Sequence, residues 1–414
     1  MSKLTKGSVV PCLFLFTLIV PNYYYVGSLR LTVYLIFTIV VFPILIYMWV
    51  VNSKVKILTS DYLILFSTLW GGIALTKAHG FSEAIEPTGV LILQTFGSYL
   101  LGRCFVRSKQ DFIRLFNSFF LVLLIFLPFG ILETLNGSGY YLRLASILGP
   151  IHDIAIMEPR KGLERAQVAF EHPILYGVFV ASGLAALASI KVGFTRIFSV
   201  FLVFVLSVTS VSTGAILAVV VQVGIISWGY IFRKSTARWR NLILLVVFGY
   251  IFIDLLSNRT PFNVFVDYLT FNSGSAYNRI LIWEYGTAEV ARHPLFGIGL
   301  ASWTRPYWMS DSMDNFWLLN AVRYGLPQFV MLAAGILFVL IKAGKASFAD
   351  DYIHKLRNGL VISIIGVIVS ICSVHLWNAT YSWFMFMVGS ATWLCESASG
   401  TNDSKRQSSI SYGN

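Results

Sequence analysis

The sequence predicts an all-α membrane protein, a bundle of about twelve membrane-spanning helices with two large extracytoplasmic loops. Of its 414 residues, 57% are hydrophobic and only 12% are charged. Soluble domains carry roughly 45–50% apolar and about 25% charged residues, so most of this surface is expected to face lipid. Aromatic residues make up 15% of the chain, in agreement with the preference of Trp and Tyr for membrane–water interfaces.

Apolar runs of roughly the length that a bilayer requires recur along the chain. The predicted spans lie near residues 8–26, 31–51, 62–76, 87–106, 115–134, 172–190, 197–211, 213–232, 241–256, 326–343, 358–374 and 378–395. Between two of them, residues 210–214 read Ser-Val-Ser-Thr-Gly, which predicts a tight turn. We expect one transmembrane domain over residues 1–397 and a polar, disordered cytoplasmic tail over residues 398–414.

The distribution of charge predicts the topology. An even number of spans puts both termini on one side, and that side collects most of the 31 Lys and Arg but few of the 19 Asp and Glu. Basic residues favour the cytoplasmic side, so both termini are expected there. Topology therefore explains the net charge of +12, and no nucleic-acid partner is expected.

Two predicted extracytoplasmic segments, residues 135–171 and 257–325, are too long to be simple connections. Both carry charged and aromatic residues, and we expect each to contain an interfacial helix; other outer turns, such as 375–377, are short. In the second loop, residues 275–292 have helical spacing, with Arg279 and Trp283 on one face. Ionisable groups are nearly absent from the spans, so the chemistry is expected in the loops rather than in an ion-coupled transport path.

Basic residues precede a span in the first loop, at Arg160, Lys161 and Arg165. An arginine at this place can bind phosphate oxygens through paired hydrogen bonds, or it can anchor the chain at lipid headgroups. Glu171 and His172 stand at the start of the next span, where an acidic residue also suits the helix dipole. The sequence alone leaves both interpretations open.

The pair Asp314-Asn315 precedes an apolar helix in the second loop. Asp314 is either a helix N-cap or a carboxylate base. Asp311 and Asp314 alone do not specify a metal, and the four cysteines have no metal-ligand spacing. We therefore predict no metal site and no cofactor.

Together these motifs resemble the O-antigen ligase/polymerase superfamily. The resemblance is carried by Arg165…Phe170-Glu171-His172-Pro173, Asn278-Arg279…Trp283, His293-Pro294-Leu-Phe-Gly297-Ile-Gly299, Asp314-Asn315-Phe-Trp-Leu and Arg323-Tyr-Gly325-Leu. Members are polytopic proteins with a large periplasmic loop late in the chain, so the resemblance implies the bacterial inner membrane.

The resemblance implies a metal-independent, inverting glycosyltransferase. Its donor is an oligosaccharide on a polyprenyl diphosphate, its acceptor is a glycan, and membrane lipids surround both. By resemblance, Arg279 and Arg165 hold the diphosphate and Asp314 takes the proton of the acceptor hydroxyl. Ligases carry a His-Asn pair at the place of Asp314-Asn315, so this chain is more similar to polymerase-type members, which join repeat units.

The predicted substrate-binding residues around these catalytic groups are Arg160, Lys161, Glu171, Trp283, Asn315 and Arg323. A chain-length regulator or an export complex is a candidate partner. Two alternatives stay open: an O-antigen ligase that transfers glycan to lipid A core, and a polysaccharide-repeat flippase.

Overall fold

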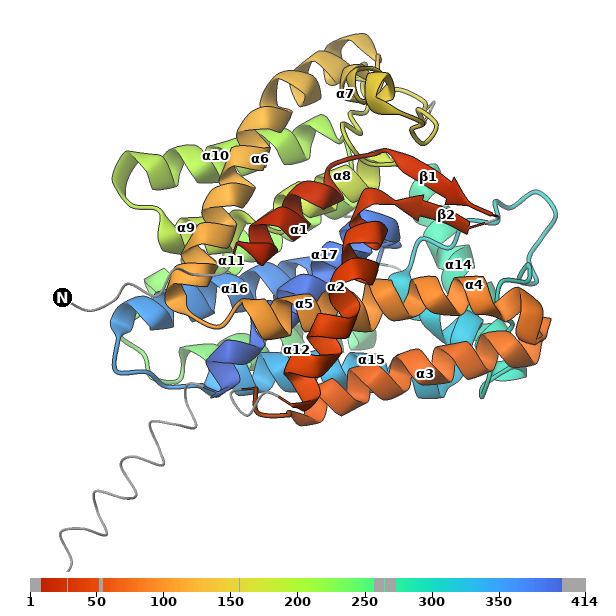
Figure 1. The fold of residues 1–414 in the computed structure, drawn as a ribbon. Helices are drawn as coiled ribbons and strands as arrows, with labels where there is room; N and C mark the ends of the chain where they lie inside the picture. Colours follow the sequence, from red (N-terminus) through yellow and green to blue (C-terminus); the bar gives the residue numbers. More distant parts are fainter. Residues whose placement is uncertain are drawn as a thin grey trace, which may run out of the picture.

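The computed structural model describes residues 9–27, 29–51, 55–155, 157–256, 264 and 273–396. The predicted tail at 398–414 and nearly all of segment 257–272 lie outside the described residues. Figure 1 shows a bundle of helices with a small two-stranded sheet at one end.

Helices dominate the part of the chain that the structure describes. In chain order the elements are α1 (Val10–Leu18), β1 (Tyr23–Val26), β2 (Leu29–Thr32), α2 (Val33–Val50), α3 (Thr59–His79), α4 (Phe81–Leu91), the π-helical turn η1 (Ile92–Gly97), α5 (Ser98–Phe105), α6 (Lys109–Asn136), α7 (Tyr140–Ala145), the 3₁₀ turn η2 (Ser146–Leu148), α8 (Pro173–Ala181), α9 (Leu184–Ile190), α10 (Gly193–Thr209), α11 (Thr213–Ile231), α12 (Arg238–Leu256), α14 (Ser273–Arg292), α15 (Phe316–Lys345), α16 (Asp351–Ser370) and α17 (Asn378–Ser390).

Every predicted span overlaps one of these helices or consecutive ones, but the first, 8–26, contains only the nine-residue helix α1 and ends in the strand β1. Within the described ranges, seven helices are long and apolar enough to cross a membrane: Val33–Val50, Lys109–Asn136, Pro173–Ile190, Thr213–Ile231, Arg238–Leu256, Phe316–Lys345 and Asp351–Ser370. The prediction of a polytopic helical membrane protein is therefore confirmed. The total of about twelve spans stays a prediction, because other candidates are short or divided, as where α4, η1 and α5 follow one another.

One element departs from the all-helical prediction. The strands β1 and β2 pair in antiparallel register from Tyr23 with Thr32 to Val26 with Leu29. Consecutive aromatic residues favour the extended chain, and Gly27, with φ of 64°, allows the turn. The unpaired edges of such a hairpin need water, which places it outside the hydrocarbon layer.

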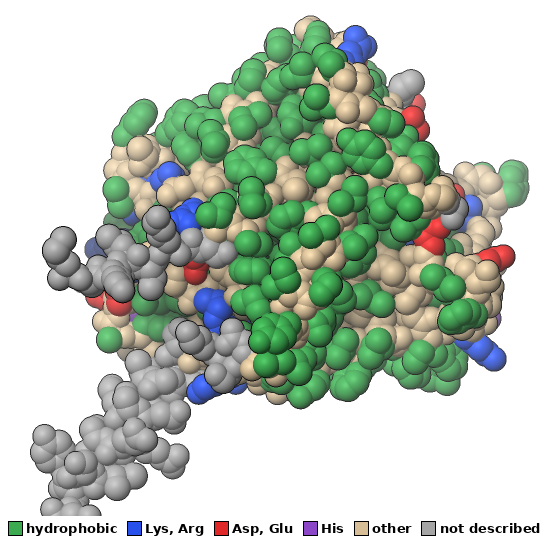
Figure 2. All heavy atoms as spheres, in the orientation of Figure 1, with side chains coloured by type: hydrophobic (Ala, Val, Ile, Leu, Met, Phe, Trp, Pro, Cys, Tyr) green, Lys and Arg blue, Asp and Glu red, His purple; other side chains and the backbone are tan. Residues whose placement is uncertain are grey.

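Hydrophobic side chains cover most of the face in Figure 2, and charged side chains gather toward opposite ends of the view. Phe194, Phe201 and Phe204 of α10 are among the large exposed hydrophobic residues. An apolar band between two charged ends is the surface that a bilayer requires.

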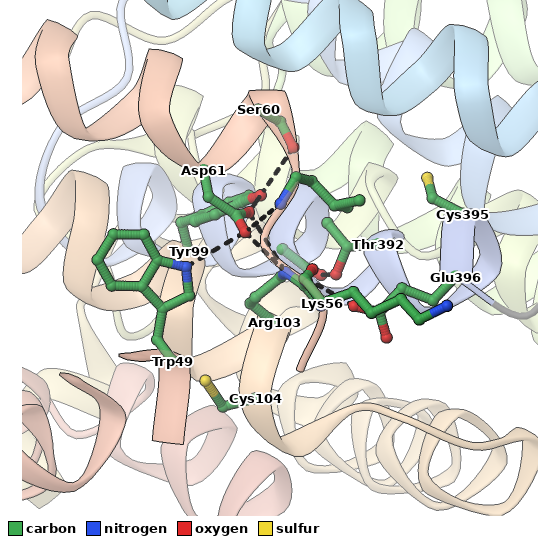
Figure 3. Close-up of polar contacts among 12 residues, drawn as sticks. Trp49, Lys56, Ser60, Asp61, Tyr99, Arg103, Cys104, Thr392, Cys395 and Glu396 are labelled. Atoms are coloured by element: carbon green, nitrogen blue, oxygen red, sulfur yellow. Dashed lines mark hydrogen bonds and ion pairs between the residues drawn. The ribbon is translucent and has the colours of Figure 1, made fainter. Parts of the chain in front are cut away.

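A buried ion network joins α3, α5 and the chain after α17 (Figure 3). The side chains of Asp61 and Arg103 are both 0% exposed, and Arg103 Nε lies 3.2 Å from Asp61 Oδ1. The indole of Trp49 and the hydroxyl of Tyr99 also donate to this carboxylate, at 3.2 and 2.5 Å. Arg103 pairs in addition with Glu396 at 2.6 Å. Segments far apart in the sequence are thus held together by one buried group of charges.

Near its end, the backbone of the second loop packs closely against a kink in α15. Gly297 and Gly325 have φ of 62° and 83°, and the N–H of Gly299 donates to the carbonyl of Arg323 at 2.9 Å. A Cβ on Gly297 would overlap the backbone of Arg323, and a Cβ on Gly325 would overlap the backbone of Leu295. The two glycine-containing motifs therefore form one structural unit, which fixes the position of Arg323.

Candidate active site

The turn between α10 and α11 brings together basic side chains from both large loops. The carbonyl oxygen of Val211 in this turn accepts a hydrogen bond from Arg160 Nη1 at 3.4 Å. Two residues later, Thr213 Oγ1 accepts one from Arg279 Nη2, also at 3.4 Å. The sequence predicted a tight turn here, and the structure shows that it lies between an arginine of the first loop and an arginine of the second.

Arg160 projects from a two-residue hairpin turn. The backbones of Arg160 and Leu163 exchange hydrogen bonds of 2.9 and 3.1 Å, and Lys161 and Gly162 between them have φ of 54° and 77°. Positive φ at both central positions is the geometry of a type I′ turn. Lys161 is exposed at the tip, whereas Arg160 is half-buried against the α10–α11 turn. The structure thus separates these two neighbouring cations.

Arg165 lies in a segment that is held on its C-terminal side. The N–H of Ala166 donates to the carbonyl of Thr209 at 3.0 Å, and the N–H of Val168 donates to the buried carboxylate of Glu133 at 2.9 Å. By contrast, Nε and Nη2 of Arg165 are buried and have no hydrogen-bond partner among the described residues. Leaving such donors unsatisfied costs about 1–3 kcal/mol or more, so this arrangement is typical of a site that receives a ligand.

Arg279 is fixed on α14 by contacts with later parts of the chain. It is only 8% exposed, and its Nε donates to the carbonyl oxygen of Ser373 at 3.0 Å. Trp283, one turn further along α14, is 45% exposed and is thus directed toward solvent rather than into the protein. The shared helix face that the spacing predicted does not bring this indole into the buried site.

Asp314 and Asn315 have different roles at the start of α15. Asn315 is the N-cap, since its Oδ1 accepts a hydrogen bond from the N–H of Leu318 at 3.0 Å. The capping role that the sequence allowed for Asp314 therefore belongs to its neighbour. Asp314 is half-buried, and its Oδ1 accepts from the Ser312 hydroxyl at 2.9 Å. The helix does not need the Asp314 carboxylate, which leaves that group for chemistry.

Arg160, Arg165, Arg279 and Asp314 form what we call the arginine cluster, because these groups act on one another electrostatically. Burial, and then the charge of Arg160, lower the pKa of Arg165 to about 10, while Asp314 opposes the change. Burial also lowers the pKa of Arg279, with Asp314 raising it and Arg160 lowering it. Three guanidinium groups against one carboxylate leave an excess of positive charge, which suits an anion with more than one charge.

A cavity of about 480 Å³ lies between α4, the start of α15 and the connection from α16 to α17. We call it the outer cavity, because it lies on the predicted extracytoplasmic side. Its polar and aromatic lining includes Glu83, Glu86, Gln94, Asn320, Arg323, Tyr324, His375, Trp377, Asn378 and Tyr381. This volume is in the range of small-molecule sites, and the mixture of amides, charged groups and rings suits a polar ligand with flat apolar faces.

The outer cavity is connected to the first loop through the segment that follows Arg165. Glu171 Oε1 accepts a hydrogen bond of 2.6 Å from Asn378 Nδ2, and the ring of His172 lies 5.8 Å from that of Trp377. Asn378 in turn accepts from Gln94 Nε2 at 3.2 Å. Glu171 thus pairs with a cavity residue rather than with the helix that follows it, and one stretch of chain leads from the arginine cluster to the cavity.

His375 and Arg323 both line the outer cavity. Nδ1 of His375 is buried and has no hydrogen-bond partner among the described residues. Burial, and then the charge of Arg323, lower the pKa of His375 to about 3. The imidazole is therefore neutral near pH 7, and its ring lies 6.2 Å from Phe316 and 5.4 Å from Trp377. A neutral ring nitrogen in this place suits a hydrogen bond with a ligand hydroxyl.

Sequence reasoning missed the connection from α16 to α17 as part of the site. It supplies the Ser373 carbonyl to Arg279, and His375, Trp377 and Asn378 to the outer cavity. The signal was present: the stretch His-Leu-Trp-Asn stands between two apolar spans. Its short length made it look like a plain turn.

Residues 198–333 match the family model described as O-antigen ligase. The matched region contains the α10–α11 turn, Arg279, Asp314 and Arg323, whereas Arg160 and Arg165 precede it. No curated protein matches the chain. The match over residues 198–333 of this integral membrane protein supports the resemblance to the O-antigen ligase/polymerase superfamily that the motifs indicated.

Proposed function

We propose that the chain is a polysaccharide polymerase-type glycosyltransferase of the bacterial inner membrane. In this proposal it joins oligosaccharide repeat units from a polyprenyl diphosphate carrier at the outer face of the membrane, without metal or cofactor. One observation carries it: Arg165 and Arg279 each interact electrostatically with both Arg160 and Asp314, and two buried nitrogens of Arg165 have no partner among the described residues. A diphosphate would satisfy these donors and offset the positive charge.

In the proposed reaction the diphosphate is the leaving group. The acceptor hydroxyl oxygen bonds to the anomeric carbon of the donor sugar while the bond from that carbon to the diphosphate oxygen breaks. The electron pair of the broken bond leaves with the diphosphate, and Arg165 and Arg279 stabilise the added negative charge. Asp314 accepts the proton of the attacking hydroxyl. Attack opposite to the leaving group inverts the configuration at that carbon.

We assign the acceptor sugar to the outer cavity. Trp377 offers a ring face, and the amides of Gln94 and Asn378 offer hydrogen bonds to hydroxyl groups. Neutral His375 adds an acceptor nitrogen. The connection through Glu171 supports an acceptor held next to the diphosphate, so that its hydroxyl reaches the anomeric carbon.

An O-antigen ligase is the second candidate, because the matching family model carries that description. A ligase would use the same donor and the same leaving group. It would place lipid A core, rather than a second repeat unit, in the outer cavity.

The lipid-linked glycans of a deletion strain distinguish these candidates. A polymerase defect leaves single repeat units on the carrier or on the core, whereas a ligase defect leaves long chains on the carrier. Rescue by Arg165→Ala, Arg279→Ala and Asp314→Asn then tests the site, with Arg305→Gln as the matched control. Arg305 lies in the second loop, as Arg279 and Asp314 do, but its guanidinium group donates to Ser302 and Met309. Full rescue by all three site variants would refute the assignment, and repeat units retained on the cytoplasmic side would indicate a flippase instead.

A further inference from the structure

A second cavity, of about 410 Å³, lies toward the other end of α11 from the arginine cluster. Thr213, which contacts Arg279, begins α11, and Tyr230 near its end lines this second cavity. The helical rise between the two residues is about 25 Å, close to the thickness of the hydrocarbon layer. We call this second cavity the inner cavity, since it lies on the predicted cytoplasmic side.

Four basic side chains from separate parts of the chain line the inner cavity. Arg196 comes from the first turn of α10, Arg233 from the connection after α11, Arg238 from the start of α12 and Lys355 from the start of α16. No acidic residue is among the lining residues, and no carboxylate of the described ranges forms an ion pair with any of the four. Like charges around one cavity repel each other, so the arrangement favours a bound anion.

Backbone carbonyls orient two of these arginines. Arg196 Nε donates to the carbonyl of Lys191 at 2.9 Å, and Arg238 Nη1 donates to the carbonyls of Gly229 and Arg233 at 3.4 and 3.3 Å. These contacts use only part of the five donors of each guanidinium group. Both cations are thus held at the cavity wall, which the general preference of basic residues for the cytoplasmic side does not require.

The rest of the wall is apolar, with Ile225, Ile226, Ile362 and the ring of Trp239. A free phosphate ion gains nothing from such a wall, whereas the glycerol and first acyl carbons of a lipid lose contact with water there. We propose that the inner cavity binds an anionic phospholipid, with the phosphate among the four cations and the chains along the isoleucines. Basic pockets between membrane helices on the cytoplasmic side are suited to such headgroups.

The test is a lipid titration of the purified full-length protein in detergent, followed by native mass spectrometry. The probes are phosphatidylglycerol, phosphatidylcholine and inorganic phosphate. The test variant is Arg233→Gln with Lys355→Gln, since both side chains are exposed and line the cavity. The matched control is Lys342→Gln with Lys345→Gln, which removes the same charge from exposed positions at the end of α15. Ala188→Phe is a third variant, which fills the cavity without changing charge.

We expect phosphatidylglycerol to bind the wild type more tightly than phosphatidylcholine does, and the test variant to lose about tenfold or more in affinity. Ala188→Phe should lose affinity as well, while the matched control stays near the wild type. Equal losses in the test and control variants would overturn the proposal, because general surface charge would then explain binding. Displacement of the lipid by inorganic phosphate at similar concentration would also overturn it, since the acyl chains would then contribute nothing.

Discussion

Glu171 Oε1 and Asn378 Nδ2 lie 2.6 Å apart, and their hydrogen bond connects the first loop to the outer cavity. We expect Asn378→Asp to reduce polymer formation by about tenfold or more, because two carboxylates at this distance repel each other. Gel analysis of polymer length in the complemented deletion strain measures the effect.

A double variant separates this contact from a general loss of structure. Glu171→Gln combined with Asn378→Asp restores an amide–carboxylate hydrogen bond with the roles exchanged, and the new carboxylate at position 378 keeps an acceptor for Gln94. Activity should therefore return toward the wild-type level. A double variant no better than Asn378→Asp alone would show that the contact does not support the reaction.

Arg165→Gln should reduce activity by about a hundredfold or more without lowering the free energy of unfolding. Burial lowers the pKa of Arg165 to about 10, so below that pH the buried charge costs folding free energy when no anion is bound. The melting temperature of the purified variant is expected to equal or exceed that of the wild type. Arg305→Gln, the matched control, should keep its activity. A strong fall in melting temperature for Arg165→Gln would instead assign this arginine a structural role.

His375 should make the protein sensitive to acid. Its pKa is about 3 in the folded protein against an ordinary value of 6.5, so between these values the folded state binds fewer protons than the unfolded state. Stability is therefore lost as the pH falls below about 6.5, by up to roughly 2 kcal/mol at pH 5. Between pH 7 and pH 5, the melting temperature of the wild type should fall further than that of His375→Asn. The same decrease in both proteins would contradict this account.

Asp314 and Asn315 should respond to substitution in opposite ways. Asp314→Asn removes the proposed base and should abolish polymer formation while the melting temperature stays unchanged, because Asn315 caps α15. Asn315→Ala removes that cap and should cost about 1 kcal/mol of stability. Paired activity and melting measurements test both outcomes, and a stability loss confined to Asp314→Asn would reverse the assignment.

The buried pair Asp61–Arg103 should be far more sensitive than an exposed one. Asp61→Asn removes one of the two carboxylates that pair with the fully buried Arg103, and we expect a loss of roughly 3–5 kcal/mol. Asp350 pairs with Lys109 at 2.9 Å near the surface, so Asp350→Asn, which keeps a helix-capping side chain, should cost much less stability. Melting temperatures in detergent compare the two. Similar losses of stability in the two variants would contradict the expected difference between the buried and the exposed ion pair.

The apolar runs made the helices predictable, because each run must satisfy its backbone within lipid. The strands β1 and β2 escaped prediction, since four-residue strands beside long apolar runs leave only a weak pattern. The division of one predicted span into α4, η1 and α5 also escaped, because its π-helical turn depends on contacts such as that of Gln94 with Tyr34.

Charged residues in the loops pointed to the candidate site, because ionisable groups within a membrane are costly and usually have a function. The sequence did not reveal which of them meet. Arg160 and Lys161 are adjacent in the chain, yet the φ angles of one turn direct them apart. His375 was overlooked because its role depends on burial and on Arg323, which lies far away in the sequence.

The hydrogen bond from Arg279 to the carbonyl of Ser373 spans 94 positions of the chain. During translation, the ribosome must therefore add α15 and α16 before the arginine on α14 finds this partner. A nascent chain halted before that point would still lack the hydrogen bond between Arg279 and Ser373. The proposed site is therefore complete only after the last helices have been added to the chain.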